Sequence, residues 1–229
     1  MQVVLYSGGY YEDNLLLNQS ILDLASKGRP RLTFIPSSSE WGMQDFAEFV
    51  DAFDHLKNLD YIYFPVDHMP SPSLVTNAFE SDIIFLAGGN TFHFLSCLRK
   101  HRMMSRLVKF AETPGKVIAG LSAGAIMMTP SISTASFPKF DCDDNFVNLK
   151  DLKSLGLVPF ELFPHYRNSD RYRRALAKYS KKSKVPILGL PDHSGMIVSA
   201  SETRLVGNVY IFHNGKSFRI DCATLPKVA

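Results

Sequence analysis

Short runs of apolar residues, rich in Val, Ile, Phe and Tyr, recur about every 25 to 30 residues in the first half of the chain. Each run has the length of a buried strand and is bounded by residues that favour turns. Segments with helix-compatible patterns separate the runs. We predict strands at residues 2–6, 31–35, 60–65, 82–87 and 117–121. We predict helices at residues 13–27, 43–56, 72–79 and 91–111.

Strands and helices that alternate in this way form right-handed βαβ units. The pattern therefore predicts an α/β fold with a mostly parallel sheet flanked by helices. Ligands bind at the carboxyl ends of the strands in such sheets. Small polar turns follow four of the predicted strands, at Ser7-Gly8-Gly9, Ser37-Ser38-Ser39, Gly88-Gly89-Asn90 and Ser122. We expect these turns to converge on one rim of the sheet.

The second half of the chain is less regular. An apolar run at 157–163 precedes Pro164-His165-Tyr166, a basic helix is predicted at 168–182, and a buried strand at 185–190 ends at Pro191-Asp192. Two alternating runs at 209–212 and 217–220 enclose Asn214-Gly215, which is a strong signal for a hairpin. We expect a C-terminal antiparallel hairpin. No shift in composition divides the chain, so residues 1–229 are predicted to form a single domain.

Composition places the chain among ordinary globular proteins, with 45% hydrophobic and 21% charged residues in 229. The formal charge of +3 is too small to indicate a nucleic-acid partner. Three cysteines, Cys97, Cys142 and Cys222, lack metal-type spacing and favour a reducing compartment. The chain shows no secretory signal pattern and no apolar run long enough to cross a membrane, so we expect a cytoplasmic protein without a membrane partner.

Residues 117–128 combine an apolar run, the sequence Gly-Leu-Ser-Ala-Gly centred on Ser122, and a helix-compatible run. A serine on a sharp turn from strand to helix is presented above the sheet edge, which makes Ser122 a candidate nucleophile. The amide of Ala123 opens the helix and has no intrahelical partner, so it could face a developing oxyanion. The alternative is a glycine-rich connection with an incidental serine.

A serine nucleophile needs a base, and seven histidines are available. For five of them the sequence does not indicate a place in the site beside a catalytic partner: His55, His68, His93, His101 and His213. His165 closes an apolar run between Pro164 and Tyr166 and suits a general base, and Asp192 ends a strand where its carboxylate could orient that histidine. The pattern leaves open a second arrangement, with His193 as base. Its orienting acid would be Asp141, Asp143 or Asp144.

The turn Gly88-Gly89-Asn90-Thr91 follows a predicted strand and starts a helix, so its amides could supply a second oxyanion donor. Asn90 or Thr91 could equally serve as the N-cap. The turn lacks the glycine spacing and the lysine of nucleotide-binding loops, and the chain has no metal-binding motif. We therefore expect no cofactor and no metal.

The densest positive run extends from Arg171 to Lys184. A solvated helix face is the most common role of such a run. A nucleic-acid surface is not favoured, because the chain shows no recognisable nucleic-acid-binding fold. A more specific hypothesis is that the Arg171 side chain turns toward the site around Ser122 and binds a substrate carboxylate through its planar guanidinium.

Four motifs together resemble the aspartyl dipeptidase, or peptidase E, family of serine peptidases, which is related to the cyanophycinases. They are Gly88-Gly89-Asn90-Thr91, Gly120-Leu121-Ser122-Ala123-Gly124-Ala125, Pro164-His165-Tyr166 and Gly189-Leu190-Pro191-Asp192. The resemblance spans nearly the whole chain. It implies a flavodoxin-like, glutamine-amidotransferase-like fold and cleavage of dipeptides with an N-terminal aspartate.

The resemblance also implies roles for individual residues. Ser122 would be the nucleophile, His165 the base and Asp192 the orienting acid. The amides of Gly89 and Ala123 would form the oxyanion hole. Arg171 would bind the substrate aspartate, and we count Asn90 among the substrate-binding residues.

Two positions depart from the family pattern. The family commonly has glutamate where this chain has the shorter Asp192, and it has an aspartate about fifteen residues after the nucleophile, where this chain has Ser136-Phe137-Pro138. Acyl transfer by Ser122 is compatible with both changes, whereas aspartate specificity depends on them more directly. The leading hypothesis is a serine-type dipeptidase, acting as a monomer or homodimer. The alternatives are a cyanophycinase-like or other amidase or esterase, and a non-catalytic ligand-binding homologue.

Overall fold

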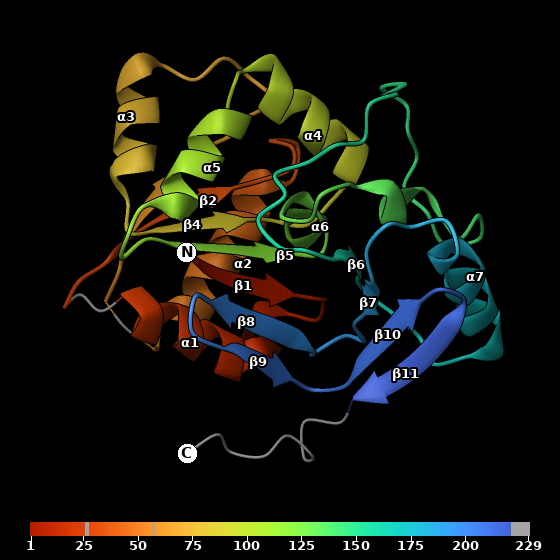
Figure 1. Ribbon diagram of the computed structural model, residues 1–229. Helices are drawn as coiled ribbons and strands as arrows, with labels where there is room; N and C mark the ends of the chain where they lie inside the picture. Colours follow the sequence, from red (N-terminus) through yellow and green to blue (C-terminus); the bar gives the residue numbers. More distant parts are fainter. Residues whose placement is uncertain (26–27, 57, 221–229) are drawn as a thin grey trace.

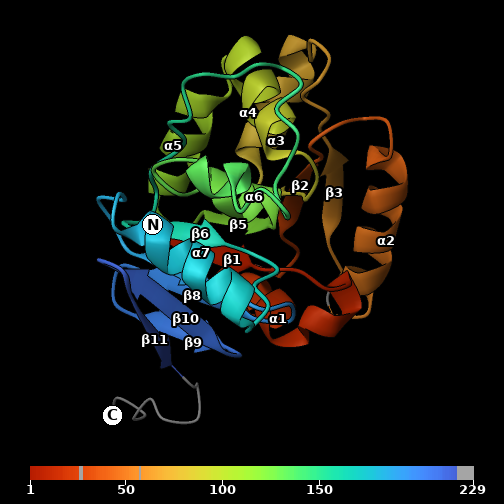
Figure 2. The ribbon, with the colours of Figure 1, turned by 90° about the vertical axis from the view of Figure 1, so that its right-hand side faces the viewer.

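The computed structural model describes residues 1–25, 28–56 and 58–220. Its larger sheet has seven strands in the order β3-β2-β4-β5-β1-β8-β9 (Figure 1; β3 is labelled in Figure 2). Five of them are parallel: β1 (Gln2–Tyr6), β2 (Arg31–Ile35), β3 (Asp60–Tyr63), β4 (Ile83–Leu86) and β5 (Val117–Leu121). β8 (Gly195–Ser199) runs antiparallel to β1, and β9 (Thr203–Val206) runs antiparallel to β8. The predicted α/β fold with a mostly parallel sheet is confirmed.

Helices cover both faces of this sheet (Figures 1 and 2). One face packs against α1 (Leu15–Ala25) and α2 (Gly42–Asp54), and the other against α3 (Pro72–Glu80), α4 (Thr91–Lys100), α5 (Met104–Glu112) and α6 (Ala123–Met127). Successive residues of β1 alternate between the two cores: Val3 and Leu5 belong to one, Val4 and Tyr6 to the other. Because both faces of the sheet are buried, the sequences of these strands are nearly continuous apolar runs.

Two predicted helices differ from those observed. The helix predicted at 91–111 is two helices, α4 and α5, because Arg102 adopts a positive φ of 59° that a continuous helix does not allow. The helix predicted at 13–27 begins with a 3₁₀ turn, η1 (Tyr11–Asn14), before α1. Residues 26–27 of that prediction lie outside the described residues.

A second, four-stranded sheet has the order β11-β10-β7-β6. β6 (Glu161–Phe163) and β7 (Ile187–Gly189) are parallel, whereas β10 (Val209–His213) and β11 (Lys216–Ile220) form the predicted antiparallel hairpin. Its turn residues Asn214 and Gly215 have φ of 51° and 79°, as a type I′ turn requires. Phe163, Tyr166, Leu176 and Phe212 belong to a third apolar cluster, in which α7 (Asp170–Ser180) packs on this sheet.

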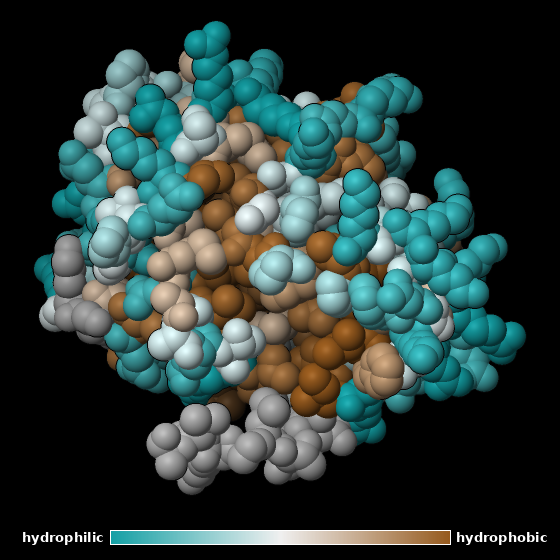
Figure 3. All heavy atoms as spheres, viewed as in Figure 1, coloured by the Kyte–Doolittle hydropathy of each residue, from teal (hydrophilic) through white to brown (hydrophobic). Residues whose placement is uncertain are grey.

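The face shown in Figure 3 carries hydrophobic side chains across its centre, and hydrophilic side chains gather around them, most densely over α7. Within the described ranges, none of the helices combines the length and apolar composition that crossing a membrane requires. A single domain was predicted over residues 1–229, of which residues 221–229 lie outside the described part.

Candidate active site

Ser122 lies between the end of β5 and the start of α6, with a backbone φ of 52° and ψ of −109°. A non-glycine residue adopts this conformation only when its surroundings hold it there. Ser122 N donates to the carbonyl of Tyr6 at 3.1 Å, and its own carbonyl accepts from Ile126 N at 3.0 Å. The turn is thus tied to both β1 and α6.

The two glycines around Ser122 allow α6 to approach the sheet. A Cβ at Gly124 would lie 2.0 Å from the carbonyl oxygen of Leu86 in β4, and a Cβ at Gly120 would lie 2.5 Å from the carbonyl carbon of Gly124. Both contacts involve backbone atoms that cannot move aside. The Gly-x-Ser-x-Gly motif therefore has a steric function, as its position between strand and helix predicts.

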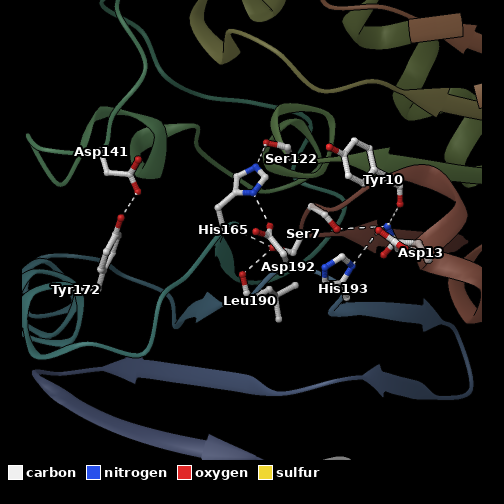
Figure 4. A network of polar contacts seen from close by, with 12 residues as sticks. Ser7, Tyr10, Asp13, Ser122, Asp141, His165, Tyr172, Leu190, Asp192 and His193 are labelled. Carbon is white, nitrogen blue, oxygen red and sulfur yellow. Dashed lines mark hydrogen bonds and ion pairs between the residues drawn. The ribbon is translucent and has the colours of Figure 1, made fainter. Parts of the chain in front are cut away.

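Ser122, His165 and Asp192 form a continuous chain of polar contacts (Figure 4). Ser122 Oγ lies 2.8 Å from His165 Nε2, and His165 Nδ1 lies 2.6 Å from Asp192 Oδ1. With the proton on Nδ1, His165 donates to Asp192 while Nε2 accepts from the Ser122 hydroxyl. The side chains of His165 and Asp192 are 47% and 50% exposed, so water screens their attraction. The contact orients the imidazole more than it stabilises the fold.

His165 and Asp192 come from the second sheet, whereas Ser122 comes from the first. His165 follows β6 and has a positive φ of 54°, and Asp192 follows β7. Tyr166 N donates to the carbonyl of Leu190 at 2.9 Å, which continues the pairing of these strands beyond their ends. Because β6 and β7 are parallel neighbours, the residues after them meet at the same end of the sheet.

Ser7 and Gly8, which directly follow β1, lie against His165 and Asp192. The sequence pattern predicted no individual role for either of them. Ser7 Oγ accepts from His165 N at 2.9 Å and donates to the carbonyl of Leu190 at 2.7 Å. A Cβ at Gly8 would lie 2.2 Å from Asp192 Oδ1 and 2.3 Å from His165 Cε1. The sequence feature that could have identified these two residues is the turn Ser7-Gly8-Gly9, directly after a predicted strand.

The amides predicted for the oxyanion hole come from two neighbouring parallel strands. Gly89 follows β4 with a φ of 120°, and Ala123 opens α6. Neither amide donates a hydrogen bond to another group in the described part of the chain. Asn90 caps α4: its Oδ1 accepts from His93 N at 2.9 Å, and its Nδ2 donates to the carbonyl of Asp144 at 2.8 Å.

A cavity of about 280 Å³ opens beside Ser122, His165 and Asp192. Its other lining residues are Thr91, Ile126, Thr134, Ala135, Asp141, Cys142, Asp143, Phe163, Pro164 and Arg167. The wall thus carries side chains of both charges next to the serine. Among the described residues, no group of three or more His, Cys, Asp or Glu side chains is placed to hold a metal ion.

The structure places Arg171 outside the lining of this cavity. Its guanidinium carbon lies 3.4 Å from the ring centroid of Phe140, a cation–π contact on the first turn of α7. Arg167, four residues earlier, lines the cavity instead. The next helical residue, Tyr172, donates to Asp141 at 2.6 Å, and the pKa of this tyrosine is raised by burial and then by that carboxylate.

The alternative pairing of His193 with an aspartate at 141–144 is not assembled. His193 Nδ1 lies 3.9 Å from Asp13 Oδ2, and its ring covers Gly9. Asp141 is turned toward Tyr172, away from His193 (Figure 4). Asp143 accepts from Thr91 N at 2.7 Å.

Phe137, which stands where the family carries an aspartate, packs into the third apolar cluster. Its ring centroid lies 3.9 Å from that of Tyr179 and 6.2 Å from that of Phe163. Besides Asp192, two carboxylates line the cavity, those of Asp141 and Asp143, a few residues after Phe137 in the chain.

Known proteins with similar sequences include peptidases. The chain is 29% identical over 224 residues to the uncharacterized peptidase YgaJ of Bacillus subtilis, an alignment that covers 96% of this chain and 91% of that protein. It is 32% identical over 150 residues to peptidase E of Streptomyces coelicolor, covering 61% of this chain and 59% of that protein.

Two crystal structures share the fold. One, from Listeria monocytogenes, superposes with a TM-score of 0.70 at 24% identity and covers 89% of this chain and 96% of that one. The other, a peptidase from an acI-B1 Actinobacterium, has a TM-score of 0.65 at 14% identity, with coverage of 96% and 93%. The model of peptidase family S51 matches residues 3–206, which is most of the chain. The four motifs and the fold agree with this match. The chain therefore belongs to peptidase family S51.

Proposed function

We propose that this chain hydrolyses short peptides through an acyl-enzyme on Ser122. The observation that carries the proposal is the unbroken contact from Ser122 Oγ through the His165 ring to Asp192, at 2.8 and 2.6 Å. A serine hydroxyl becomes a nucleophile only when a base accepts its proton, and this geometry provides the base and the group that orients it.

In the proposed reaction, His165 Nε2 accepts the hydroxyl proton as Ser122 Oγ attacks the carbonyl carbon of the substrate. Asp192 stabilises the resulting imidazolium. The amides of Gly89 and Ala123, which have no acceptor among the described residues, bind the oxyanion. His165 then donates its proton to the leaving amine, and the ester is hydrolysed by water that His165 deprotonates.

For the substrate we propose dipeptides with an N-terminal aspartate. The cavity of about 280 Å³ suits a small ligand. Arg167 is the guanidinium on its wall, so we assign to Arg167, in place of Arg171, the binding of the substrate side-chain carboxylate.

The nucleophile is tested by labelling and by turnover. Wild-type protein should react with a fluorophosphonate probe and hydrolyse members of a panel of Asp-X and other dipeptides. Ser122→Ala should remain folded, fail to react with the probe and lose at least about 1,000-fold in kcat, since attack requires the Oγ. Equal turnover by both proteins would refute the role of Ser122. An unreactive Ser122 in folded wild-type protein would favour a non-catalytic binding protein.

The two arginines form a matched pair for the specificity test. Arg167→Ala should reduce kcat/KM for Asp-X by about 10- to 100-fold, because a charge-assisted hydrogen bond is lost, and should affect Ala-X much less. Arg171→Ala should have a smaller effect, since its guanidinium lies on Phe140. Steady-state kinetics on both dipeptide series decide the assignment. Preferential hydrolysis of β-linked Asp-Arg would instead favour a cyanophycinase-like activity.

A further inference from the structure

A second cavity lies at the carboxyl edge of the seven-stranded sheet, on the opposite face from the first. Its volume is about 340 Å³, and its wall includes Tyr11 of η1, Trp41 at the start of α2, and Gly89. Tyr11 belongs to the core under α1 and α2, whereas Ile126 of the first cavity belongs to the core on the other face. In Figure 2, where the carboxyl ends of the parallel strands face the viewer, α2 and α6 lie on opposite sides of the sheet.

The turn that carries Ser122 lies between the two cavities. Ser122 lines the first cavity, and the preceding residue, Leu121, lines the second. A Cβ at Gly88 would lie 3.7 Å from Ser122 Cβ and 3.9 Å from the carbonyl oxygen of Leu121. Gly88 and Gly89 both line the second cavity. A peptide bond held over Ser122, with its oxygen at the Gly89 amide, therefore has one cavity on each side.

A buried hydroxyl on the wall of the second cavity has no partner in the described part of the chain. Ser37 is 9% exposed, and its Oγ forms no hydrogen bond with any described residue. This oxygen lies 2.0 Å from the position that a Cβ would take at Gly89, so it faces the turn after β4. A buried hydroxyl without a partner costs free energy, and native structures seldom retain one without a reason. A polar group of a ligand in the cavity would satisfy it.

The strand register places Ser37 within reach of a peptide on Ser122. Leu86 of β4 pairs with Ile35 of β2 and with Gly120 of β5. Two residues later, Ser37 and Ser122 are level, separated by two strand spacings or about 10 Å between backbones. The residue after the attacked carbonyl adds about 3.5 Å, and a hydrogen bond to a hydroxyl about 2.8 Å, which with the two serine side chains covers that gap.

The rest of the wall offers aromatic surface. Trp41 is 70% exposed and supplies no side-chain hydrogen bond to the helix that it precedes, so neither the core nor the cap of α2 explains it. The ionisable residues of the wall, Tyr11 and Asp45, bond to each other at 2.6 Å. An apolar group placed against the indole removes area from water on both surfaces, which favours its binding.

We propose that the second cavity binds the residue that leaves when Ser122 attacks. An apolar side chain of this residue lies against Trp41, and its carboxyl oxygen accepts from Ser37 Oγ. The inference rests on the proposed function, in which Arg167 holds the first residue of the substrate in the other cavity. The chain thus selects the second residue of a dipeptide as well as the first, and prefers leucine or phenylalanine there over glycine.

Turnover of dipeptides with a common first residue tests the cavity. That residue is the one selected by the dipeptide panel, or aspartate if none is hydrolysed, and the second residue is leucine, phenylalanine or glycine. Leucine and phenylalanine should give a kcat/KM at least about 10-fold above glycine, because a side chain buried in an apolar pocket contributes that much. Equal kcat/KM for the three dipeptides overturns the proposal.

Variants at the start of α2 locate the preference. Trp41→Ala should remove most of it and leave the glycine dipeptide nearly unaffected. Met43→Ala is the matched control: it deletes another exposed apolar side chain from the same turn, outside the cavity wall, and should keep the preference. An equal loss in Met43→Ala, or an unchanged preference in Trp41→Ala, would overturn the role of Trp41.

The hydroxyl is tested with a leaving group that has no carboxyl. Ser37→Ala should lower kcat/KM about 10-fold for the leucine dipeptide, because a hydrogen bond to a charged group is lost. It should have little effect on the anilide of the same first residue. The melting temperature should change by only a few degrees, since no described residue uses this hydroxyl. Equal losses for both substrates would assign Ser37 to the oxyanion turn and refute its contact with the leaving residue.

Binding to the Ser122→Ala protein separates the two proposals. Calorimetry should show tighter binding of the leucine dipeptide than of the glycine dipeptide, whether or not the wild type hydrolyses them. Ser122-dependent hydrolysis without a preference for the second residue refutes the role of this cavity and leaves the serine peptidase intact. Preferential binding that Trp41→Ala abolishes, without turnover or fluorophosphonate labelling, refutes the acyl-enzyme and supports the cavity.

Discussion

The absence of a side chain at position 8 allows His165 and Asp192 to meet. The space that a Cβ would occupy there is filled by Asp192 Oδ1 and His165 Cε1, at 2.2 and 2.3 Å. These are side-chain atoms, which can move without unfolding the chain. A substitution at this residue would therefore act on the alignment of the site before it acts on the fold.

We predict that Gly8→Ala reduces kcat by about 100-fold or more, since a displacement of 1 Å in a reacting group costs about that much. The melting temperature should fall by only a few degrees. Gly28→Ala is the control, because no heavy atom lies within 4 Å of a Cβ at that position. Kinetics and thermal unfolding of both variants check this, and full activity in Gly8→Ala would contradict it.

At the scale of elements, the position of Ser122 depends on how closely α6 lies against β4 and β5. The five residues of α6 are all buried, and Gly124 is the contact with Leu86. A short helix has little stability of its own, so packing against the sheet maintains it.

Gly124→Ala should destabilise the protein by about 3 kcal/mol, the upper end of the usual cost of overpacking, because its Cβ would lie 2.0 Å from a backbone oxygen. Gly88→Ala offers the comparison, since its nearest neighbour would be Ser122 Cβ at 3.7 Å. That change should alter stability by less than about 1 kcal/mol. Urea unfolding of both variants measures the difference, and equal losses would disprove the steric account.

At the scale of the whole molecule, the site is formed where two sheets meet. Ser122 belongs to the seven-stranded sheet, while His165 and Asp192 follow strands of the four-stranded one. Ser7, fully buried at the end of β1, links the two through His165 N and the carbonyl of Leu190. The alignment of Ser122, His165 and Asp192 then depends on how the two sheets are joined as well as on each sheet.

Ser7→Ala should cost about 1 kcal/mol, because it leaves the partly buried amide of His165 without its acceptor. It should also lower kcat more than it changes KM, since the histidine loses its anchor. Ser194→Ala is the matched control: this serine is 3% exposed, and its hydroxyl bonds to no described residue. Denaturant unfolding and steady-state kinetics test both, and a loss of stability with unchanged kcat would show that the link is structural only.

Much of this protein follows from local sequence. The five parallel strands, the turn at Ser122 and the C-terminal hairpin are each encoded within a few consecutive residues, by apolar runs and by glycines at sharp turns. The order of His165 and Asp192 along the chain also pointed to their partnership, through the motif resemblance. Such features are predictable because burial on both faces and backbone conformation constrain adjacent residues directly.

Only the tertiary structure decided which side chains face the cavity. Arg167 and Arg171 are similar in sequence context, yet one lines the cavity and the other lies on Phe140. The buried hydroxyl of Thr134 and the bond from Thr91 to Asp143 depend on contacts between segments far apart in the chain. By itself the sequence determined the strands, the turn at Ser122 and the family. The division into two sheets and the walls of the substrate cavity were decided by long-range packing, which local patterns do not record.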